Sequence, residues 1–194
     1  MRKNSLEIKR MVGLASLAAI VVILQLFSNY VQFGPVSITL ALIPIVVGAI
    51  IYGEKGGFVL GLIHGAIVCT APTTIALFMP ITAFGTIVVC LLKSGLAGFV
   101  SGLLYKLLKN KNNNLAIVTA SIIVPIVNTG IFSLACFTIF NPLITDFAAK
   151  ANQGFAAYFF LTFIGFNFLI EFFVNSVLSP VVLRIVELYS AKLK

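Results

Sequence analysis

Hydrophobic positions fill most of this chain in long runs, which are separated by short clusters of glycine, proline and charged residues. Runs that approach 20 residues and carry almost no charge are typical of transmembrane helices. Breaking the sequence at these clusters predicts six spans, roughly residues 11–30, 36–52, 58–70, 84–107, 115–140 and 155–188. We therefore expect an all-α integral membrane protein that forms a single six-helix domain over residues 1–194.

The third span is short for a full crossing, and the apolar stretch that follows it, residues 71–80, is interrupted by Pro72 and Pro80. Irregular backbone at membrane depth is tolerated only where protein or a cavity satisfies its polar groups. We expect this stretch to be a loop that folds back at that depth.

Composition supports the membrane interpretation, because 60% of the residues are hydrophobic, 9% are charged and the mean hydropathy is +1.14. Soluble domains contain about 25% charged residues. Six spans in 194 residues leave no room for a soluble catalytic or nucleotide-binding domain, so an energy source would have to come from a partner. Phosphate-binding loops, zinc motifs and paired acidic motifs are absent from the sequence, which argues against an enzyme.

The net charge of +8 is concentrated at the ends of the spans rather than interleaved with aromatic residues, so we expect no nucleic-acid partner. Cytoplasmic loops carry an excess of lysine and arginine. If the N-terminus is inside, eleven of the thirteen basic residues lie on that face and only Lys150 lies on the other. This distribution predicts an even number of spans with both termini inside.

Lys93 and Glu171 are charged residues inside predicted spans. An ionised side chain near the bilayer centre costs about 2.5–3.5 kcal/mol, so it normally faces the bundle interior, pairs with an opposite charge or lines a wet cavity. At about 1.5 Å per residue, Lys93 lies roughly 13 Å below Phe84, and Glu171 lies roughly 20 Å below Tyr158. These depths allow a direct pair but do not require one.

Amides accompany these charges within the spans. Asn167 and Asn175 lie four residues before and after Glu171, so the three form one polar stripe on the last helix, and Asn128 lies in the fifth span. Asn175, near the inner end, is expected to serve helix packing. Lys93, Asn128, Asn167 and Glu171 are equally compatible with a binding site and with a buried structural network.

His64 is the only histidine, and neither a second histidine nor a carboxylate lies at metal-ligand spacing. We therefore expect no metal, and we interpret His64 as an interhelical hydrogen-bonding residue or, alternatively, a donor lining a cavity. Small residues repeat every four positions at Gly57, Gly61 and Gly65, and again at Ser94, Gly98 and Gly102. Such strips let helices approach closely. Cys69, Cys90 and Cys136 lie in apolar runs and are interpreted as packing residues.

Several segments together resemble a known family. They are ITLALIPIVVGAIIYGEKGGFVLGLIHG, FGTIVVCLLKSGLAG, PIVNTGIF, NFLIEFFVNSVLSPVV, and the AxxxA of Ala15 and Ala19 in the first span. Their order, the length of the chain and the six-helix topology resemble the substrate-binding S components of energy-coupling factor (ECF) transporters, the vitamin importers of many Gram-positive bacteria.

The resemblance implies a high-affinity capture subunit that takes one micronutrient from outside the cytoplasmic membrane and topples when it docks on a coupling protein driven by two ABC-type ATPases. No cofactor is implied. On the family pattern, Ala15 and Ala19 face the coupling protein. Residues 28–37, residues 71–83 and the outer halves of helices four to six enclose the substrate.

Carried onto this chain, the resemblance implies a substrate site at Lys93, Asn128, Asn167 and Glu171. Apolar walls are expected from Phe78, Phe84 and Phe132. Lys93 would bind a carboxylate or carbonyl group, unless Glu171 neutralises it permanently. An unpaired Lys93 favours an anionic vitamin such as pantothenate, and folate and cobalamin remain alternatives.

A second class of function is a stand-alone secondary transporter or channel, in which Lys93 and Glu171 would act as an ion or proton relay. A third class is an assembly scaffold, in which an apolar pair could replace these two residues with little loss.

Overall fold

The computed structural model describes residues 2–29, 32–33, 36–37 and 39–191, and nearly all of them are helical. The long helices are α1 (Arg2–Ser28), α2 (Leu42–Cys69), α3 (Ala83–Leu108), α4 (Asn113–Thr138) and α7 (Gly165–Ala191). The shorter elements are strands β1 (Gln32–Phe33) and β2 (Val36–Ser37), helices α5 (Asn141–Lys150) and α6 (Phe155–Ala157), and the π-helical turns η1 (Thr74–Phe78) and η2 (Tyr158–Phe163).

Five helical segments of the described residues are long and apolar enough to cross a membrane: Glu7–Ser28, Leu42–Cys69, Ala83–Leu108, Asn113–Thr138 and Phe155–Leu188. The chain is therefore a multi-pass membrane protein. Four of the six predicted spans each correspond to one of these segments, whereas the second and third predicted spans both overlap α2.

Helix α2 reverses direction at Gly53, whose backbone is not helical (φ 82°, ψ −176°). Glycine adopts a positive φ at little cost because it has no Cβ atom. A Cβ atom on Gly48 would collide with the side chain of Leu60. In a straight helix these two residues would be about 18 Å apart, so their contact shows that the two arms of α2 fold back on each other. The predicted break between the second and third spans is therefore present as a turn at Gly53, but each arm is shorter than the roughly 20 residues of a straight crossing. The sixth crossing stays a prediction.

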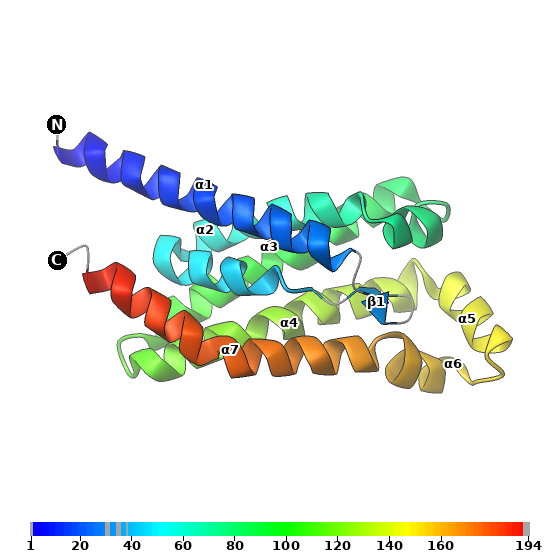
Figure 1. Cartoon of the computed structure of the whole chain (residues 1–194). Helices are drawn as coiled ribbons and strands as arrows, with labels where there is room; N and C mark the ends of the chain where they lie inside the picture. Colours follow the sequence, from blue (N-terminus) through cyan, green and yellow to red (C-terminus); the bar gives the residue numbers. More distant parts are fainter. Residues whose placement is uncertain (1, 30–31, 34–35, 38, 192–194) are drawn as a thin grey trace.

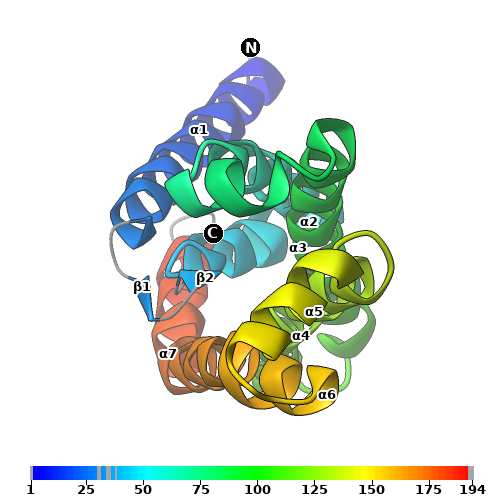
Figure 2. The same ribbon diagram turned by 90° about the vertical axis from the view of Figure 1, so that its right-hand side faces the viewer.

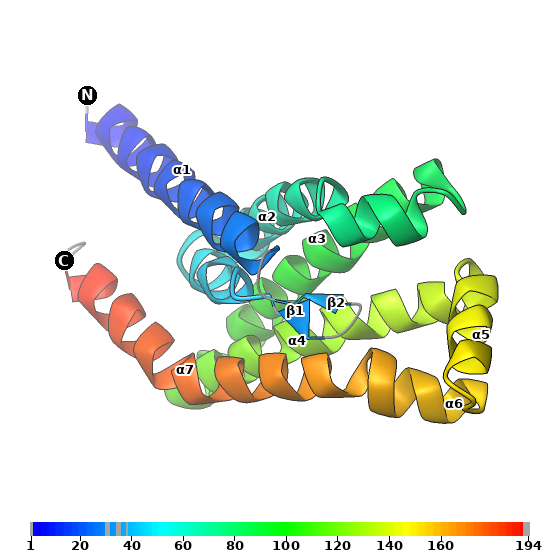
Figure 3. The same ribbon diagram turned by 45° about the vertical axis from the view of Figure 1, so that its right-hand side comes forward.

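The two termini lie at one end of the molecule, and α5 and α6 lie at the other (Figures 1 and 3). The turn of α2 is joined to the last turn of α3 by an ion pair, in which Lys106 Nζ lies 3.0 Å from Glu54 Oε1. Between α1 and α2 the chain forms a small antiparallel hairpin in which Gln32 is opposite Ser37 and Phe33 is opposite Val36. Figure 2 shows this hairpin between α1 and α7 in projection.

Two predicted boundaries were wrong. The second span was expected to begin at residue 36, but β2 occupies this position and α2 begins at Leu42. Residues 71–80 were expected to form a loop, but most of them are helical and include η1. Pro72 is the first helical residue of that stretch, where its missing N–H would have no intrahelical partner anyway, so proline starts a helix here instead of breaking one.

Glycine strips on α2 and α3 pack directly against each other. The backbone of Gly57 lies against that of Gly98, and a Cβ atom on Gly61 would lie 2.6 Å from the carbonyl carbon of Ser94. A Cβ atom on Gly65 would likewise lie 2.9 Å from the carbonyl carbon of Cys90. This confirms the predicted close approach of the two small-residue strips.

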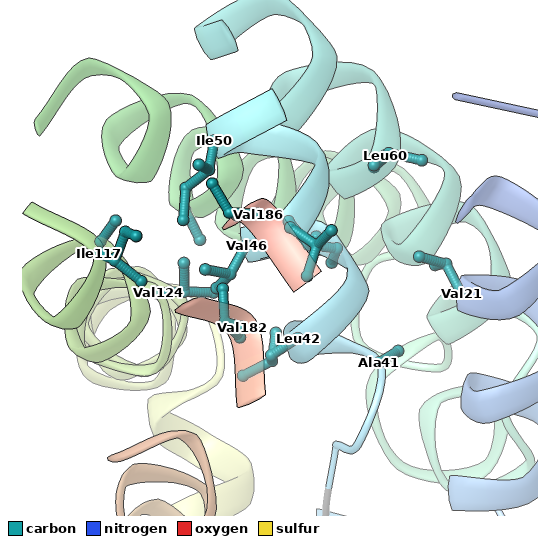
Figure 4. Packing of buried hydrophobic residues seen from close by; sticks show 14 residues of the cluster. Val21, Ala41, Leu42, Val46, Ile50, Leu60, Ile117, Val124, Val182 and Val186 are labelled. Atoms are coloured by element: carbon teal, nitrogen blue, oxygen red, sulfur yellow. The ribbon is translucent and has the colours of Figure 1, made fainter. Parts of the chain in front are cut away.

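Two apolar clusters fill the interior. The first is aliphatic and packs the first arm of α2 against α1, α4 and α7, and Figure 4 shows ten of its residues by name. The second is aromatic, lies near α5 and η2, and includes Phe78, Phe140, Phe159 and Phe163. A polar cavity is enclosed next to the aromatic cluster.

Candidate functional site

A cavity of about 70 Å³ lies among α1, α2, α3, α4 and α7, beside η1. Its polar lining residues are Gln25, Thr39, Thr73, Thr74, Thr86, Cys90, Lys93, Asn128, Thr129 and Glu171. Its apolar lining residues are Val68, Phe78, Val89, Phe132, Phe140, Ile164 and Phe168. A wall that combines aromatic and aliphatic side chains with convergent polar groups is typical of a small-molecule site.

Lys93 extends from α3 into this cavity. Its Nζ lies 4.9 Å from the centre of the Phe132 ring on α4, which is within the range of a cation–π contact. Among the side chains that the structure describes, Lys93 has no hydrogen-bond acceptor and no ion-pair partner. The ammonium group is therefore available to an anion that enters the cavity.

Glu171 lines the same cavity from α7 but is occupied by a different partner. Its side chain is buried, and its Oε1 accepts a hydrogen bond of 2.9 Å from the backbone N–H of Thr39. Thr39 lies between β2 and α2, so this bond connects the segment after the hairpin to α7. The Glu171 carboxylate does not form an ion pair with Lys93 in the described structure.

Asn128 on α4 is buried, with 4% of its surface exposed, and its Oδ1 has no hydrogen-bond partner among the described residues. A buried acceptor without a partner costs about 1–3 kcal/mol. Because Asn128 lines the cavity, this acceptor is open to a donor brought by a ligand.

A chain of buried hydrogen bonds crosses three helices beside the cavity. His64 Nε2 donates to Gln25 Oε1 (2.9 Å), and the hydroxyl of Ser94 donates to His64 Nδ1 (2.8 Å). Gln25 Nε2 in turn donates to Asn29 Oδ1 (2.9 Å). Because Gln25 Oε1 can only accept, Nε2 of the ring carries the proton. The expectation that His64 bonds between helices is confirmed.

The aromatic residues predicted for the site separate into two groups. Phe78 and Phe132 both line the cavity and meet edge to face, with ring centres 5.6 Å apart. Phe84, by contrast, does not line it, and 79% of its surface is exposed. The side chain of Asn167, also predicted for the site, lies outside the described residues.

Sequence reasoning did not identify several lining residues, notably Gln25, Thr39, Thr86 and Phe168. Gln25 carried a usable signal, because an amide in the middle of an otherwise apolar span requires a polar partner. Thr86 did not, since a hydroxyl that bonds to its own helix is ordinary in an apolar helix, and the Thr86 hydroxyl donates to the carbonyl of Thr82. Thr39 did not either, because its bond to Glu171 joins residues 132 positions apart.

Helix α1 leaves a broad face uncovered on the opposite side from α2. Ala15 and Ala19 are both exposed on this face, and Met11 and Ile23 beside them are 71% and 65% exposed. Two alanines one turn apart leave a flat strip on which another helix can lie closely.

Comparison with known proteins identifies one family model that matches this chain, described as the ECF transporter, substrate-specific component, and the match covers residues 9–183. No curated protein and no solved structure gives a match. The matched region contains all five membrane-spanning segments in whole or in large part, and every residue that lines the cavity. The chain therefore belongs to the family of ECF transporter substrate-specific components.

Proposed function

We propose that this chain is the high-affinity capture subunit of a vitamin importer in the bacterial cytoplasmic membrane. Family membership makes it a transport subunit rather than an enzyme, and it implies association with a coupling protein and ATPases. The observation that carries the proposal is the cavity, because it holds an ammonium group without an ion-pair partner and an amide oxygen without a hydrogen-bond donor among the described residues.

In the proposed topology the chain crosses the membrane six times, with both termini inside. Two features support it. The basic residues of the α3–α4 connection belong to the end where the termini lie, whereas Lys150 belongs to α5 at the opposite end (Figure 1). Lining residues such as Thr74 and Phe78 come from η1, which also lies toward the α5 end, so the cavity would face outside.

In the proposed transport cycle, α1 docks on the coupling protein through Ala15 and Ala19, and the whole subunit then topples to release its substrate inside. The exposure of both alanines supports this assignment, since a docking face cannot be covered by the chain's own helices.

Pantothenate is the substrate that we propose. Its carboxylate suits an ammonium group that has no ion-pair partner among the described residues, and folate and cobalamin stay the alternatives. The relay mechanism finds less support, because a proton exchange between Lys93 and Glu171 would require contact, and the Glu171 carboxylate is instead bonded to Thr39.

Reconstitution tests this function. Proteoliposomes that contain the chain, a coupling protein and two ATPases should accumulate labelled pantothenate when ATP is supplied, and hydrolysis-deficient ATPases should abolish the uptake. The chain by itself should bind the vitamin without transporting it. Uptake by the chain alone, driven by a proton gradient, would establish the relay mechanism instead.

A further inference from the structure

We infer that the cavity selects molecules that carry two groups together: a carboxylate, which Lys93 binds, and an N–H or O–H donor, which Asn128 Oδ1 accepts. This inference rests on the proposed capture function and specifies the chemistry of the same cavity. A molecule with only one of the two groups should bind much more weakly.

The charge balance of the chain supports the first requirement. Of its five acidic residues, three form ion pairs elsewhere, Glu171 accepts from Thr39, and Glu7 lies exposed on α1. None of these five forms an ion pair with Lys93, although Glu171 lines the same cavity and lies within electrostatic range of it. A cation inside a membrane-spanning segment normally faces an opposite charge or a wet cavity, so the anion that pairs with Lys93 is supplied by the ligand.

The second requirement follows from the chemistry of Asn128. Its Oδ1 accepts hydrogen bonds and cannot donate them, and no described N–H or O–H group reaches it. A site that leaves a buried polar atom unpaired strongly rejects an analogue that lacks the matching group. Asn128 Oδ1 therefore accepts a hydrogen bond from an N–H or O–H group of the ligand.

The two groups lie close enough for one small molecule to reach both. Asn128 and Phe132 are one helical turn apart on α4, a rise of about 6 Å. The Nζ of Lys93 lies 4.9 Å from the ring of Phe132. A ligand a few bonds long can thus place its carboxylate at Lys93, its donor at Asn128 and its apolar atoms against Phe78 and Phe132.

Three compounds separate the requirements. Pantothenate carries a carboxylate together with amide and hydroxyl donors. Panthenol keeps the donors but replaces the carboxylate with an alcohol, and nicotinate has a carboxylate without an N–H or O–H donor. Titration calorimetry of the full chain in mild detergent should show the highest affinity for pantothenate, with both other compounds at least about tenfold weaker.

Substitutions assign each requirement to its residue. Lys93→Met should weaken pantothenate binding at least about tenfold and weaken panthenol binding much less, because panthenol has no carboxylate to pair with the ammonium group. The control Lys109→Met, which removes an exposed lysine just beyond the end of α3, should change neither affinity.

Asn128→Leu distinguishes a ligand-reading residue from a structural one. It should raise the melting temperature of the empty protein, because it removes an unsatisfied buried acceptor, and it should weaken pantothenate binding at least about tenfold. A structural amide would show a lower melting temperature with unchanged affinity, and that result would overturn its role.

The remaining outcomes separate the inference from the proposed function. Equal affinity for pantothenate and panthenol overturns the carboxylate requirement. Tight binding of riboflavin, which has no carboxylate, in place of pantothenate overturns the inference but leaves vitamin capture intact. Failure to bind any vitamin of a broad panel contradicts both.

Discussion

At the scale of single residues, the sequence predicted the polar residues of the cavity better than its aromatic residues. Lys93, Asn128 and Glu171 could be predicted because a charge or an amide inside an apolar span is costly unless it faces a cavity or a partner. Phe84 shows the limit, because the chain contains 18 phenylalanines and an apolar pattern does not reveal whether a ring faces lipid or the interior.

Replacing Phe132 and Phe84 in turn tests this distinction. Phe132→Leu removes an aromatic ring that lines the cavity and positions the Lys93 ammonium group, so pantothenate affinity should fall several-fold. Phe84→Leu should leave the affinity unchanged, because this ring is exposed. If Phe84→Leu weakened binding as much as Phe132→Leu, Phe84 would belong to the site as the sequence suggested.

His64 gives a second prediction at this scale, one of stability. His64→Leu leaves Gln25 Oε1 without its donor and removes the acceptor of Ser94, so the free energy of unfolding should fall by about 1–3 kcal/mol. Thermal unfolding in detergent would measure the loss. Thr138→Val is the control, because its hydroxyl bonds only to its own helix at an exposed position. An unchanged melting temperature for His64→Leu would show that the hydrogen-bond chain contributes no stability.

At the scale of elements, the hydropathy pattern predicted the long helices, and the prediction failed where proline begins a helix instead of ending one. Hydropathy alone located α1, α3, α4 and α7. The helical stretch at Pro72 was missed because proline both interrupts helices and begins them. The helix α5 was not anticipated either, and it begins with Pro142 in its first turn for the same reason.

The contact between α2 and α3 depends on the absence of side chains at its centre. Gly61→Ala places a methyl group against the backbone of Ser94, and overpacking of this kind costs typically about 1–3 kcal/mol. Gly130→Ala, on α4, is the matched control, because no atom lies within 4 Å of its added Cβ. The first variant should lower the melting temperature in detergent and the second should not. Equal effects would mean that helix propensity, rather than close packing, decides these positions.

At the scale of the whole molecule, the sequence predicted the family, the membrane class and the break that separates the two arms of α2. It could not predict the cavity, because Thr39 and Glu171 are separated by 132 positions and meet only after the bundle closes. Neither could it show that α1 leaves Ala15 and Ala19 uncovered, since the same spacing serves an internal neighbour and an external partner equally well.

The exposed alanines give a prediction about coupling. Ala15→Leu combined with Ala19→Leu should abolish ATP-driven uptake in the reconstituted transporter, because bulk prevents a close helix contact. Pantothenate binding to the isolated chain should persist, since both residues lie on the opposite side of α1 from the bundle. Loss of binding together with uptake would contradict the assignment of this face to the coupling protein.

The most direct test of the central claim is the identity of what the chain captures. Protein purified in mild detergent would be denatured, its small molecules identified by mass spectrometry, and the compound found titrated back by calorimetry into the wild-type chain and Lys93→Met. We predict one carboxylate vitamin per chain, bound tightly by the wild-type protein and weakly by the variant. A chain that carries no vitamin and binds none would contradict the capture function.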